Sequence, residues 1–335
     1  MVGLPRVTVL SLGGTISSTD SGGRGVEPTL TGEALVSDVP EIAEFAEVSA
    51  VSFRQAASGE LTVEDLVELA AEIERIVDGG AAGVVVTQGT DTIEETSFVL
   101  DLLVHREAPV VVTGAMRNPT LPGADGPANL LAAIQVAASD TARGLGAVVV
   151  LNDEIHAARF VRKTHTSNPA TFRSAPVGPL GWISEDRVRV LLRPMGERKV
   201  TVPEDGGNPS VALYVVPLGD DGRLLPAIRQ TGYDGLVVEA MGGGHVPSVM
   251  VEALEDLARE MPVVLASRAG TGEVLRSTYG FPGSEMDLLE RGLIPAGLLD
   301  GRKARLLLTL LLRSGAAQEE IRSTFDSWLD EPVER

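Results

Sequence analysis

The fold class of this 335-residue chain follows from the stretch Gly83-Val-Val-Val-Thr87-Gln-Gly-Thr90-Asp91-Thr92-Ile-Glu-Glu95. Its first five residues are too continuously apolar for a strand with one wet face, so they predict a central strand buried on both faces. Thr92-Ile-Glu-Glu95 then has the spacing of a capping box, which predicts a helix through about Val104. A buried strand that passes directly into a helix is typical of α/β proteins.

The same alternation of strand and helix extends on both sides of this stretch. Short β-branched runs predict strands at residues 7–12, 48–53, 109–113 and 147–151 and, after a break, at 211–216, 235–239 and 262–267. Segments of helical period separate them, as at residues 62–77 and 128–138.

This order predicts a larger N-terminal α/β domain at residues 1–190, with a doubly wound, mostly parallel sheet. A smaller C-terminal α/β domain is expected at residues 211–335. The turn residues Pro203-Glu-Asp-Gly-Gly-Asn-Pro-Ser210 end the stretch 191–210, which is therefore expected to connect the two domains.

Composition excludes several kinds of site and partner. The chain has no cysteine, which rules out disulfides, thiolate nucleophiles and cysteine-ligated zinc. Its 28 Lys and Arg against 47 Asp and Glu give a net charge of −19 without a basic run, so nucleic acid and anionic membranes are poor partners. Apolar runs fall short of the roughly 20 residues that cross a bilayer. Because the N-terminus reads as a strand and not as a signal peptide, a cytoplasmic location is expected.

Hydroxyl side chains follow two of the predicted strands, at the sheet edge where ligands collect in parallel sheets. Leu12-Gly-Gly-Thr15 ends the first strand, and Gln88-Gly-Thr-Asp91 ends the central one. A third segment, residues 159–168, adds Lys163. A lysine held beside Asp91 could be the base that a threonine nucleophile needs. Each feature alone has a simpler interpretation as a tight turn, a helix cap or a surface charge, but their co-occurrence favours a nucleophilic site.

Four motifs stand in order along the chain. They are Ser11-Leu-Gly-Gly-Thr-Ile16, Val86-Thr-Gln-Gly-Thr-Asp-Thr-Ile-Glu-Glu-Thr96, Val112-Thr-Gly-Ala-Met-Arg117, and Lys163-Thr-His-Thr166 with Phe172 and Gly178-Pro-Leu-Gly181. With these motifs the sequence resembles the bacterial-type L-asparaginases, which include the glutaminase-asparaginases, over nearly its whole length. The resemblance implies hydrolysis of the side-chain amide of L-asparagine to L-aspartate and ammonia. Whether the protein also has some L-glutaminase activity stays open.

The resemblance also assigns the catalytic residues. Thr15 is the expected primary nucleophile, and Thr90, Asp91 and Lys163 form the expected supporting triad. Thr15 would attack the amide, ammonia would leave, and water would hydrolyse the acyl-enzyme. No metal or other cofactor is required, and the four histidines of the chain show no metal-ligand spacing.

The matched substrate-binding residues provide one group for the negative charge of the substrate and others for its positive charge. Ser58, followed by Gly59 in Ala57-Ser-Gly-Glu60, matches the residue that holds the substrate α-carboxylate. Asp91 and Glu285 match the carboxylates that hold its α-ammonium. The family supplies the second carboxylate from a neighbouring subunit, so the resemblance implies a homotetramer, a dimer of dimers, with active sites shared between subunits.

The sequence departs from the family pattern at two positions. The loop after Thr15 lacks the family's activating tyrosine, so either Tyr279 replaces it or the lysine triad acts alone. His245 stands where many members have an asparagine that helps to orient Glu285. A histidine there would introduce pH dependence near neutrality, or would simply cap the following helix.

Two rival functions stay open at this point. A non-catalytic amino-acid-binding or regulatory protein on the same two-domain fold would need Ser58, Asp91 and Glu285 but not the threonines and the lysine together. A nucleotide-binding protein could use the Gly-Gly turn for phosphate, but the Gly-x-Gly-x-x-Gly fingerprint and a P-loop lysine are absent. Asparagine and glutamine differ by one methylene, worth only about 1–3 kcal/mol in binding, so the preference between them also stays open.

Overall fold

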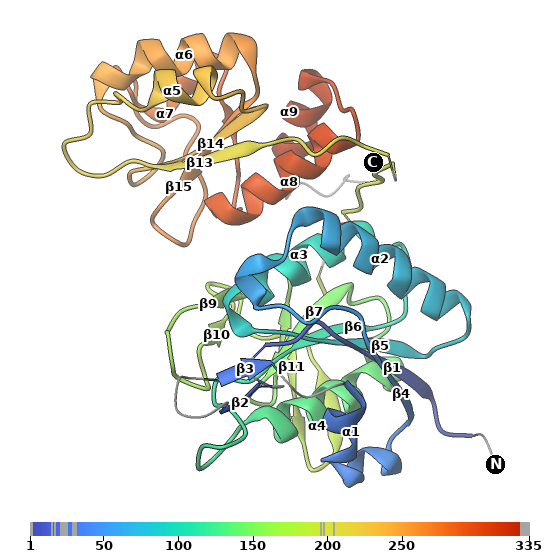
Figure 1. Cartoon of the computed structure of the whole chain (residues 1–335). Coiled ribbons are helices and arrows are strands. Elements are labelled where there is room, and N and C mark those ends of the chain that lie inside the picture. Colours follow the sequence, from blue (N-terminus) through green and yellow to red (C-terminus); the bar gives the residue numbers. More distant parts are fainter. Residues whose placement is uncertain are drawn as a thin grey trace. The chain divides into compact units, whose positions relative to one another are not determined.

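The computed structural model describes residues 3–14, 16, 18–20, 26–28, 32–194, 196, 198–203 and 205–328, with only the backbone described at 18–20 and 26–28. The chain divides into two compact units, Met1–Lys199 and Val200–Arg335, called here the first and the second unit (Figure 1). A large, mostly parallel sheet in the first and a smaller parallel sheet in the second confirm the predicted fold class. The limits of the connection at residues 191–210 stay a prediction.

In the described part of the first unit, eight strands form one sheet in the order β12-β11-β8-β7-β6-β5-β1-β4. Strands β7, β6, β5, β1 and β4 are parallel, and β8, β11 and β12 continue the sheet in antiparallel fashion. The strand bounds in this unit are β1 (Arg6–Ser11), β2 (Ser18–Asp20), β3 (Val26–Pro28), β4 (Glu47–Ser52), β5 (Gly83–Thr87), β6 (Val110–Thr113), β7 (Ala147–Leu151), β8 (Glu154–Ala157), β9 (Arg162–Lys163), β10 (Phe172–Arg173), β11 (Gly181–Ser184) and β12 (Arg187–Val190).

Helices cover both faces of this sheet, with α2 and α3 on one face and α1 and α4 on the other (Figure 1). The helical bounds are α1 (Gly32–Ser37), α2 (Val63–Asp78), α3 (Ile93–Leu103) and α4 (Gly126–Ala137), with 3₁₀ turns η2 (Pro40–Glu44), η3 (Ser58–Glu60), η4 (Thr90–Thr92) and η5 (Asp140–Ala142). The predicted helix at residues 62–77 is confirmed as α2, and Thr62-Val-Glu-Asp65 forms a capping box at its start. The Thr62 hydroxyl accepts from the Asp65 N–H, and the Asp65 carboxylate accepts from the Thr62 N–H.

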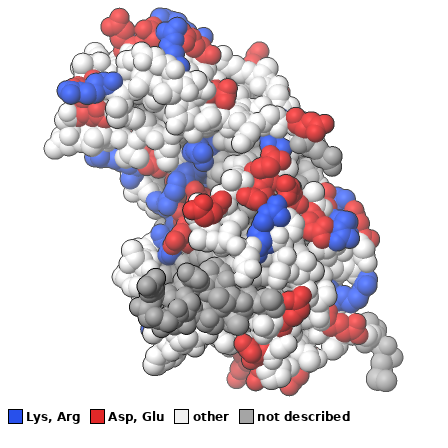
Figure 2. Space-filling model, viewed as in Figure 1, with Lys and Arg blue, Asp and Glu red and all other residues white. Residues whose placement is uncertain are grey.

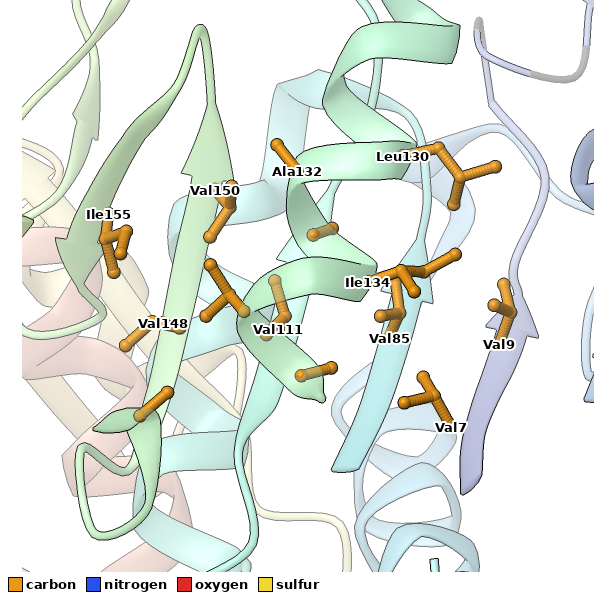
Figure 3. Packing of buried hydrophobic residues seen from close by; sticks show 14 of the residues in the cluster. Val7, Val9, Val85, Val111, Leu130, Ala132, Ile134, Val148, Val150 and Ile155 are labelled. Carbon is orange, nitrogen blue, oxygen red and sulfur yellow. The ribbon is translucent and has the colours of Figure 1, made fainter. Parts of the chain in front are cut away.

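The core between α4 and the sheet is built from branched aliphatic side chains. Leu130 and Ile134 on α4 face Val85 on β5, Val111 on β6 and Val148 on β7 (Figure 3). All five side chains are buried. Strand β5 is buried at every residue and lies inside the sheet, as its unbroken apolar run predicted.

The register of the parallel strands aligns their carboxyl ends. Ser11 pairs with Thr87, and Thr87 pairs with Thr113, so the turns that follow β1, β5 and β6 leave the sheet at one edge. This edge is where ligands bind in open parallel sheets.

The antiparallel extension was not predicted from the sequence. Two-residue turns at Asn152-Asp153 and Glu185-Asp186 make the hairpins β7–β8 and β11–β12, and all four residues have positive φ, between 49° and 60°. Such left-handed pairs match the twist of the adjoining strands. Strands β8, β11 and β12 are only four residues long, which is too short for an alternating pattern to stand out.

In the described part of the second unit, four parallel strands form a sheet in the order β13-β14-β15-β16. Helices α5 and α6 lie over one face and α8 over the other (Figure 1). The bounds are β13 (Val211–Val215), α5 (Leu225–Gln230), β14 (Gly235–Ala240), η6 (Ser248–Met250), α6 (Val251–Glu260), β15 (Val263–Ser267), α7 (Glu285–Glu290), β16 (Ile294–Pro295), α8 (Gly301–Arg313) and α9 (Gln318–Asp326).

Acidic partners accompany many of the surface arginines. Arg54 lies 3.0 Å from Asp65, and Arg106 lies 2.8 Å from Asp78. In Figure 2 many blue side chains likewise adjoin red ones. Such exposed pairs contribute little stability each, but they offset basic charge locally. Among the described helices, none combines the length and the apolar character needed to cross a bilayer.

Candidate active site

Two glycines allow the turn after β1 to pack closely against two other segments of backbone. Gly13 and Gly14 have φ of 101° and 90°, in the left-handed region that favours glycine. A Cβ on Gly14 would lie 2.0 Å from the Gly89 nitrogen, and one on Gly13 would lie 2.7 Å from the Ala56 oxygen. The turn that leads to Thr15 is therefore fixed against the turn after β5 and the segment before η3. Thr15 itself lies outside the described residues.

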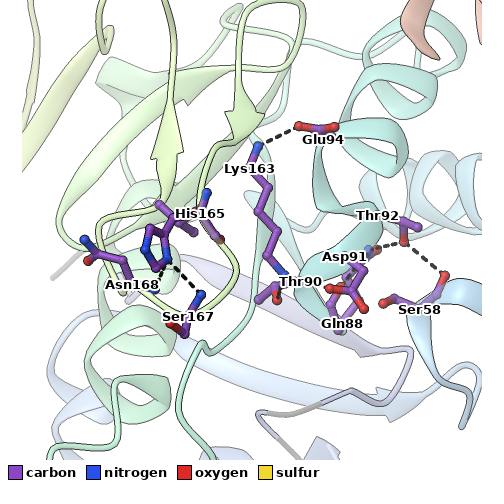
Figure 4. A network of polar contacts seen from close by, with 12 residues as sticks. Ser58, Gln88, Thr90, Asp91, Thr92, Glu94, Lys163, His165, Ser167 and Asn168 are labelled. Atoms are coloured by element: carbon purple, nitrogen blue, oxygen red, sulfur yellow. Dashed lines mark hydrogen bonds and ion pairs between the residues drawn. The ribbon is translucent and has the colours of Figure 1, made fainter. Parts of the chain in front are cut away.

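Lys163 joins the turn after β5 to the hairpin that follows β8. Its Nζ atom donates to Thr90 Oγ1 over 2.8 Å and to Asp91 Oδ1 over 2.7 Å (Figure 4). The structure thus brings together the three residues expected to form a triad. Their catalytic role stays a prediction.

Solvent exposure increases from Thr90 through Lys163 to Asp91. Thr90 is buried, the Lys163 side chain is 16% exposed and the Asp91 side chain is 79% exposed. The ammonium is therefore held by one hydroxyl and one carboxylate near the surface. Such a group can supply or accept a proton at Thr90 and can stabilise negative charge there. The outer part of the Asp91 carboxylate stays accessible to a cationic ligand.

Ser58 lies against the same turn. It begins the 3₁₀ turn η3 and is buried, and a Cβ on Gly89 would lie 2.7 Å from Ser58 Oγ. A Cβ placed on Gly59 would meet no heavy atom of the described residues within 4 Å. The residue expected to hold a carboxylate thus lies beside the turn that carries Thr90 and Asp91.

The capping role expected of Thr92 is wrong. Thr92 occupies the N-cap of α3 but makes no capping bond from its side chain, and its φ of −119° and ψ of 16° fall outside the extended conformation that an N-cap usually adopts. Its hydroxyl instead donates to the Ser58 carbonyl oxygen over 3.1 Å and accepts from Gln88 Nε2 over 3.2 Å. Gln88 and Thr92 therefore support η3, a role that was not predicted from the sequence. The spacing of four residues between Gln88 and Thr92 was the signal in the sequence that could have indicated their contact.

In the second unit, Glu285 is a buried carboxylate with three donors. Its Oε1 accepts from the N–H groups of Thr278 over 2.9 Å and Tyr279 over 2.7 Å, and His245 Nε2 lies 3.1 Å from its Oε2. Burial raises the pKa of Glu285, but the Tyr279 and Thr278 N–H groups, with His245, outweigh that effect and hold the pKa below its ordinary value. The carboxylate is therefore ionised at neutral pH, and His245 Nε2 is the donor.

Two aromatic side chains pack against the His245 ring. The His245 ring lies 4.9 Å from the Tyr279 ring and 5.3 Å from the Phe281 ring, in edge-on contacts. His245 thus bonds to Glu285 and does not cap α6, whose N-cap Met250 has no side-chain cap bond. Tyr279 is 44% exposed and lies next to Glu285. That Tyr279 activates Thr15 stays a prediction.

Both units match known family models. Residues 6–195 match the family described as "Asparaginase, N-terminal", and residues 210–325 match "Glutaminase/Asparaginase C-terminal domain". The chain belongs to the asparaginase family. The matched segments include all of the predicted site residues.

Individual asparaginases resemble the chain over nearly its full length. An L-asparaginase of Bacillus licheniformis is 36% identical, with 92% of this chain and 96% of that protein covered. A probable periplasmic L-asparaginase of Haemophilus influenzae is 33% identical, with 97% and 93% covered. The crystal structure of a probable cytoplasmic L-asparaginase from Campylobacter jejuni has a TM-score of 0.88 at 30% identity, with 96% of this chain and 99% of that chain covered.

Proposed function

We propose that this protein hydrolyses the side-chain amide of L-asparagine to L-aspartate and ammonia. The observation that carries the proposal is the pair of hydrogen bonds from the Lys163 ammonium to Thr90 and Asp91 in a chain of the asparaginase family. An amino-acid-binding protein without catalysis would have no need for a lysine directed at a buried threonine.

The proposed reaction is a double displacement at one carbonyl carbon. Thr15 Oγ attacks the amide carbon, the C–N bond breaks, and the nitrogen leaves as ammonia after it takes up a proton. Water then adds to the acyl ester, the bond to Thr15 Oγ breaks, and aspartate leaves. Thr90 and Lys163 form a proton-transfer pair for one or both steps, since their polar atoms are 2.8 Å apart.

The substrate would be held by a group for each of its charges. The Ser58 hydroxyl, with Gly59 leaving open space beside it, would bind the α-carboxylate. The Asp91 carboxylate would bind the α-ammonium on the side that Lys163 leaves exposed. Charge-assisted bonds of this kind give recognition from a small contact area.

The catalytic assignment is tested by ammonia release from Thr15→Ala and Lys163→Met. Thr15→Ala should abolish hydrolysis in a folded protein, and Lys163→Met should slow it by about 10²–10⁴, the usual cost of a lost general acid or base. Lys199→Met is the matched control, because Lys199 donates to the Asp101 carbonyl oxygen in the same unit, away from Thr90. Wild-type binding of asparagine without ammonia release would favour the binding-protein alternative, and the same assay with glutamine would measure glutaminase activity.

We also propose that each active site is shared between two chains of a homotetramer, with Glu285 of the partner subunit as the second ammonium ligand. The support is the ionised, buried carboxylate with its three donors, together with the family resemblance. Thr15→Ala and Glu285→Ala chains, each inactive alone, should recover about a quarter of wild-type activity when folded together, because half of the randomly paired dimers carry one intact site. No recovery despite proven subunit exchange would place Glu285 in its own chain's site.

A cytoplasmic location is a further proposal. It is supported by the likeness to a solved structure described as a probable cytoplasmic L-asparaginase. Fractionation of cells that express the protein tests it, and recovery in the periplasm would refute it.

A further inference from the structure

Glu94 is a buried carboxylate that contacts the backbone of Lys163. It lies on the first turn of α3 and is 2% exposed. Its Oε2 atom accepts a hydrogen bond from the Lys163 N–H over 2.6 Å, as Figure 4 shows. In the sequence, Glu94 belongs to the predicted helix start and to the second family motif.

The backbone around Lys163 has little other support from strand pairing. Lys163 belongs to β9, a strand of two residues that pairs with β10 through Phe172 and Arg173. This pair forms a sheet of its own, apart from the eight-stranded sheet. Two-stranded pairs of this size are marginal without outside contacts, so the bond to Glu94 fastens this hairpin to a helix of the main fold.

Both ends of Lys163 therefore bind one short segment, residues 90–94. The ammonium donates to Thr90 and Asp91, and the backbone N–H donates to Glu94. We propose that Glu94 is a positioning residue that sets the place of the Lys163 ammonium through its backbone. This proposal rests on the catalytic role of Lys163 proposed above.

The chemistry of the contact favours a carboxylate at this position. A buried carboxylate is costly unless it is hydrogen-bonded, and a bond from an N–H to an ionised acceptor is roughly twice as strong as a neutral one. The first turn of a helix also favours negative charge. A lysine side chain has four flexible bonds, so its ammonium can occupy many positions. A fixed backbone position at Lys163 restricts that range. A misplacement of about 1 Å at a catalytic group can cost about 10² in rate.

Three variants test the proposal by kinetics. Glu94→Met removes the acceptor at nearly constant volume and should lower kcat for asparagine at least about ten-fold with KM within about two-fold. Glu94→Gln keeps an acceptor oxygen and should retain at least about a third of wild-type kcat. Glu95→Gln is the matched control, because it removes one negative charge from the same helical turn, and it should stay within about two-fold of wild type.

A double-mutant cycle separates positioning from general damage. Glu94→Met should add little to Lys163→Met if it acts through the lysine, whereas independent effects would multiply. Multiplied effects, or equal losses in Glu94→Gln and Glu94→Met, would overturn the proposal. An unchanged rate in Lys163→Met would instead refute the proposed role of the lysine, so the two failures are distinguishable.

Hydrogen exchange provides a readout that does not depend on activity. The Lys163 amide should exchange faster in Glu94→Met than in wild type, while amides in β1 and β5 keep their protection. If Glu94→Met does not fold, the comparison uses Glu94→Gln, in which that amide should stay protected. A Lys163 amide that is equally protected with and without the Glu94 acceptor, or unprotected in the wild type, would overturn the proposal.

Discussion

His245 donates from Nε2 to Glu285 Oε2 across 3.1 Å, so its ring contacts the carboxylate proposed to hold the substrate ammonium. The other oxygen, Oε1, accepts from the Thr278 and Tyr279 N–H groups. Because His245 contacts a proposed substrate-binding group and not the reacting atoms, a change at His245 should alter substrate affinity more than turnover.

His245→Ala should raise KM for asparagine several-fold and leave kcat less affected, because it removes the donor to Glu285 Oε2. His245→Asn, whose side chain can still donate to Glu285, should stay closer to the wild type. Initial rates at a series of substrate concentrations measure the effect. Equal KM values for the wild type and His245→Ala would show that His245 does not influence this binding step.

Thr92→Val should raise KM for asparagine several-fold and leave kcat less affected. Valine keeps the volume but loses the hydroxyl that links Gln88 to the Ser58 carbonyl oxygen, at a cost of about 1–3 kcal/mol for the unsatisfied groups. The control is Thr96→Val on the same helix, because Thr96 Oγ1 is buried without a hydrogen-bond partner among the described residues. Equal effects of the two substitutions on KM would mean that the Thr92 bond does not support Ser58.

Gly14→Ala should lower both stability and activity much more than Gly144→Ala. Both glycines have positive φ, 90° and 71°, so each alanine carries the left-handed strain of about 1–2 kcal/mol. Only the alanine at Gly14 would also meet backbone at 2.0 Å, since at Gly144 a Cβ has no atom of the described part of the chain within 4 Å. Urea unfolding and ammonia release measure the two effects, and equal losses would show that close approach is not what requires glycine at Gly14.

His156 should make the protein less stable in acid. Burial lowers the pKa of His156 to about 4, with the positive charge of Arg173 acting in the same direction, even though Glu154 Oε2 lies 3.4 Å from its Nε2. The unfolded chain binds this proton near pH 6.5 and the folded one only near 4, so the stability is complete above about 6.5 and falls as pH decreases between these values, by roughly 3 kcal/mol.

Urea unfolding at pH 7.5, 5.5 and 4.5 tests this contribution, with the pH values set on either side of about 6.5. His156→Gln should show a smaller loss of unfolding free energy in acid than the wild type. Ser174→Ala removes only the partner of His156 Nδ1, 3.0 Å away, and should keep the wild-type slope. The same slope in His156→Gln would assign the acid sensitivity to other groups.

The sequence predicted every described parallel strand except the two-residue β16, together with helices α2, α3 and α4, because each of these has a strong local signal. The unbroken valines of β5 and the capping box at Thr62 and Asp65 are examples. The hairpins from β8 to β12 were missed because their strands are short and their turns use Asn152-Asp153 and Glu185-Asp186, which are less distinctive than a turn with glycine.

The strand-end segments predicted a lysine beside Asp91, and the family resemblance implied Thr90 as the third member. The structure places the three residues together. The supporting contacts were not expected. Thr92 and Glu94 have residue types that also suit a helix start, so local sequence could not show that their partners are Ser58 and Lys163, from distant parts of the chain.

The close approach of Gly14 to Gly89 has a consequence for changing this protein in the laboratory. Because the backbone of Gly14 lies directly against the backbone of Gly89, no substitution of a side chain between them can shift the turn before Thr15 by a small amount. Gly89 is constrained again on its other side by Ser58 Oγ. A mutant library that aims to shift the balance between asparagine and glutamine should therefore leave Gly13, Gly14 and Gly89 unchanged. Its variation belongs at flexible side chains, such as Tyr279, which is predicted to activate Thr15, and His245, which contacts Glu285.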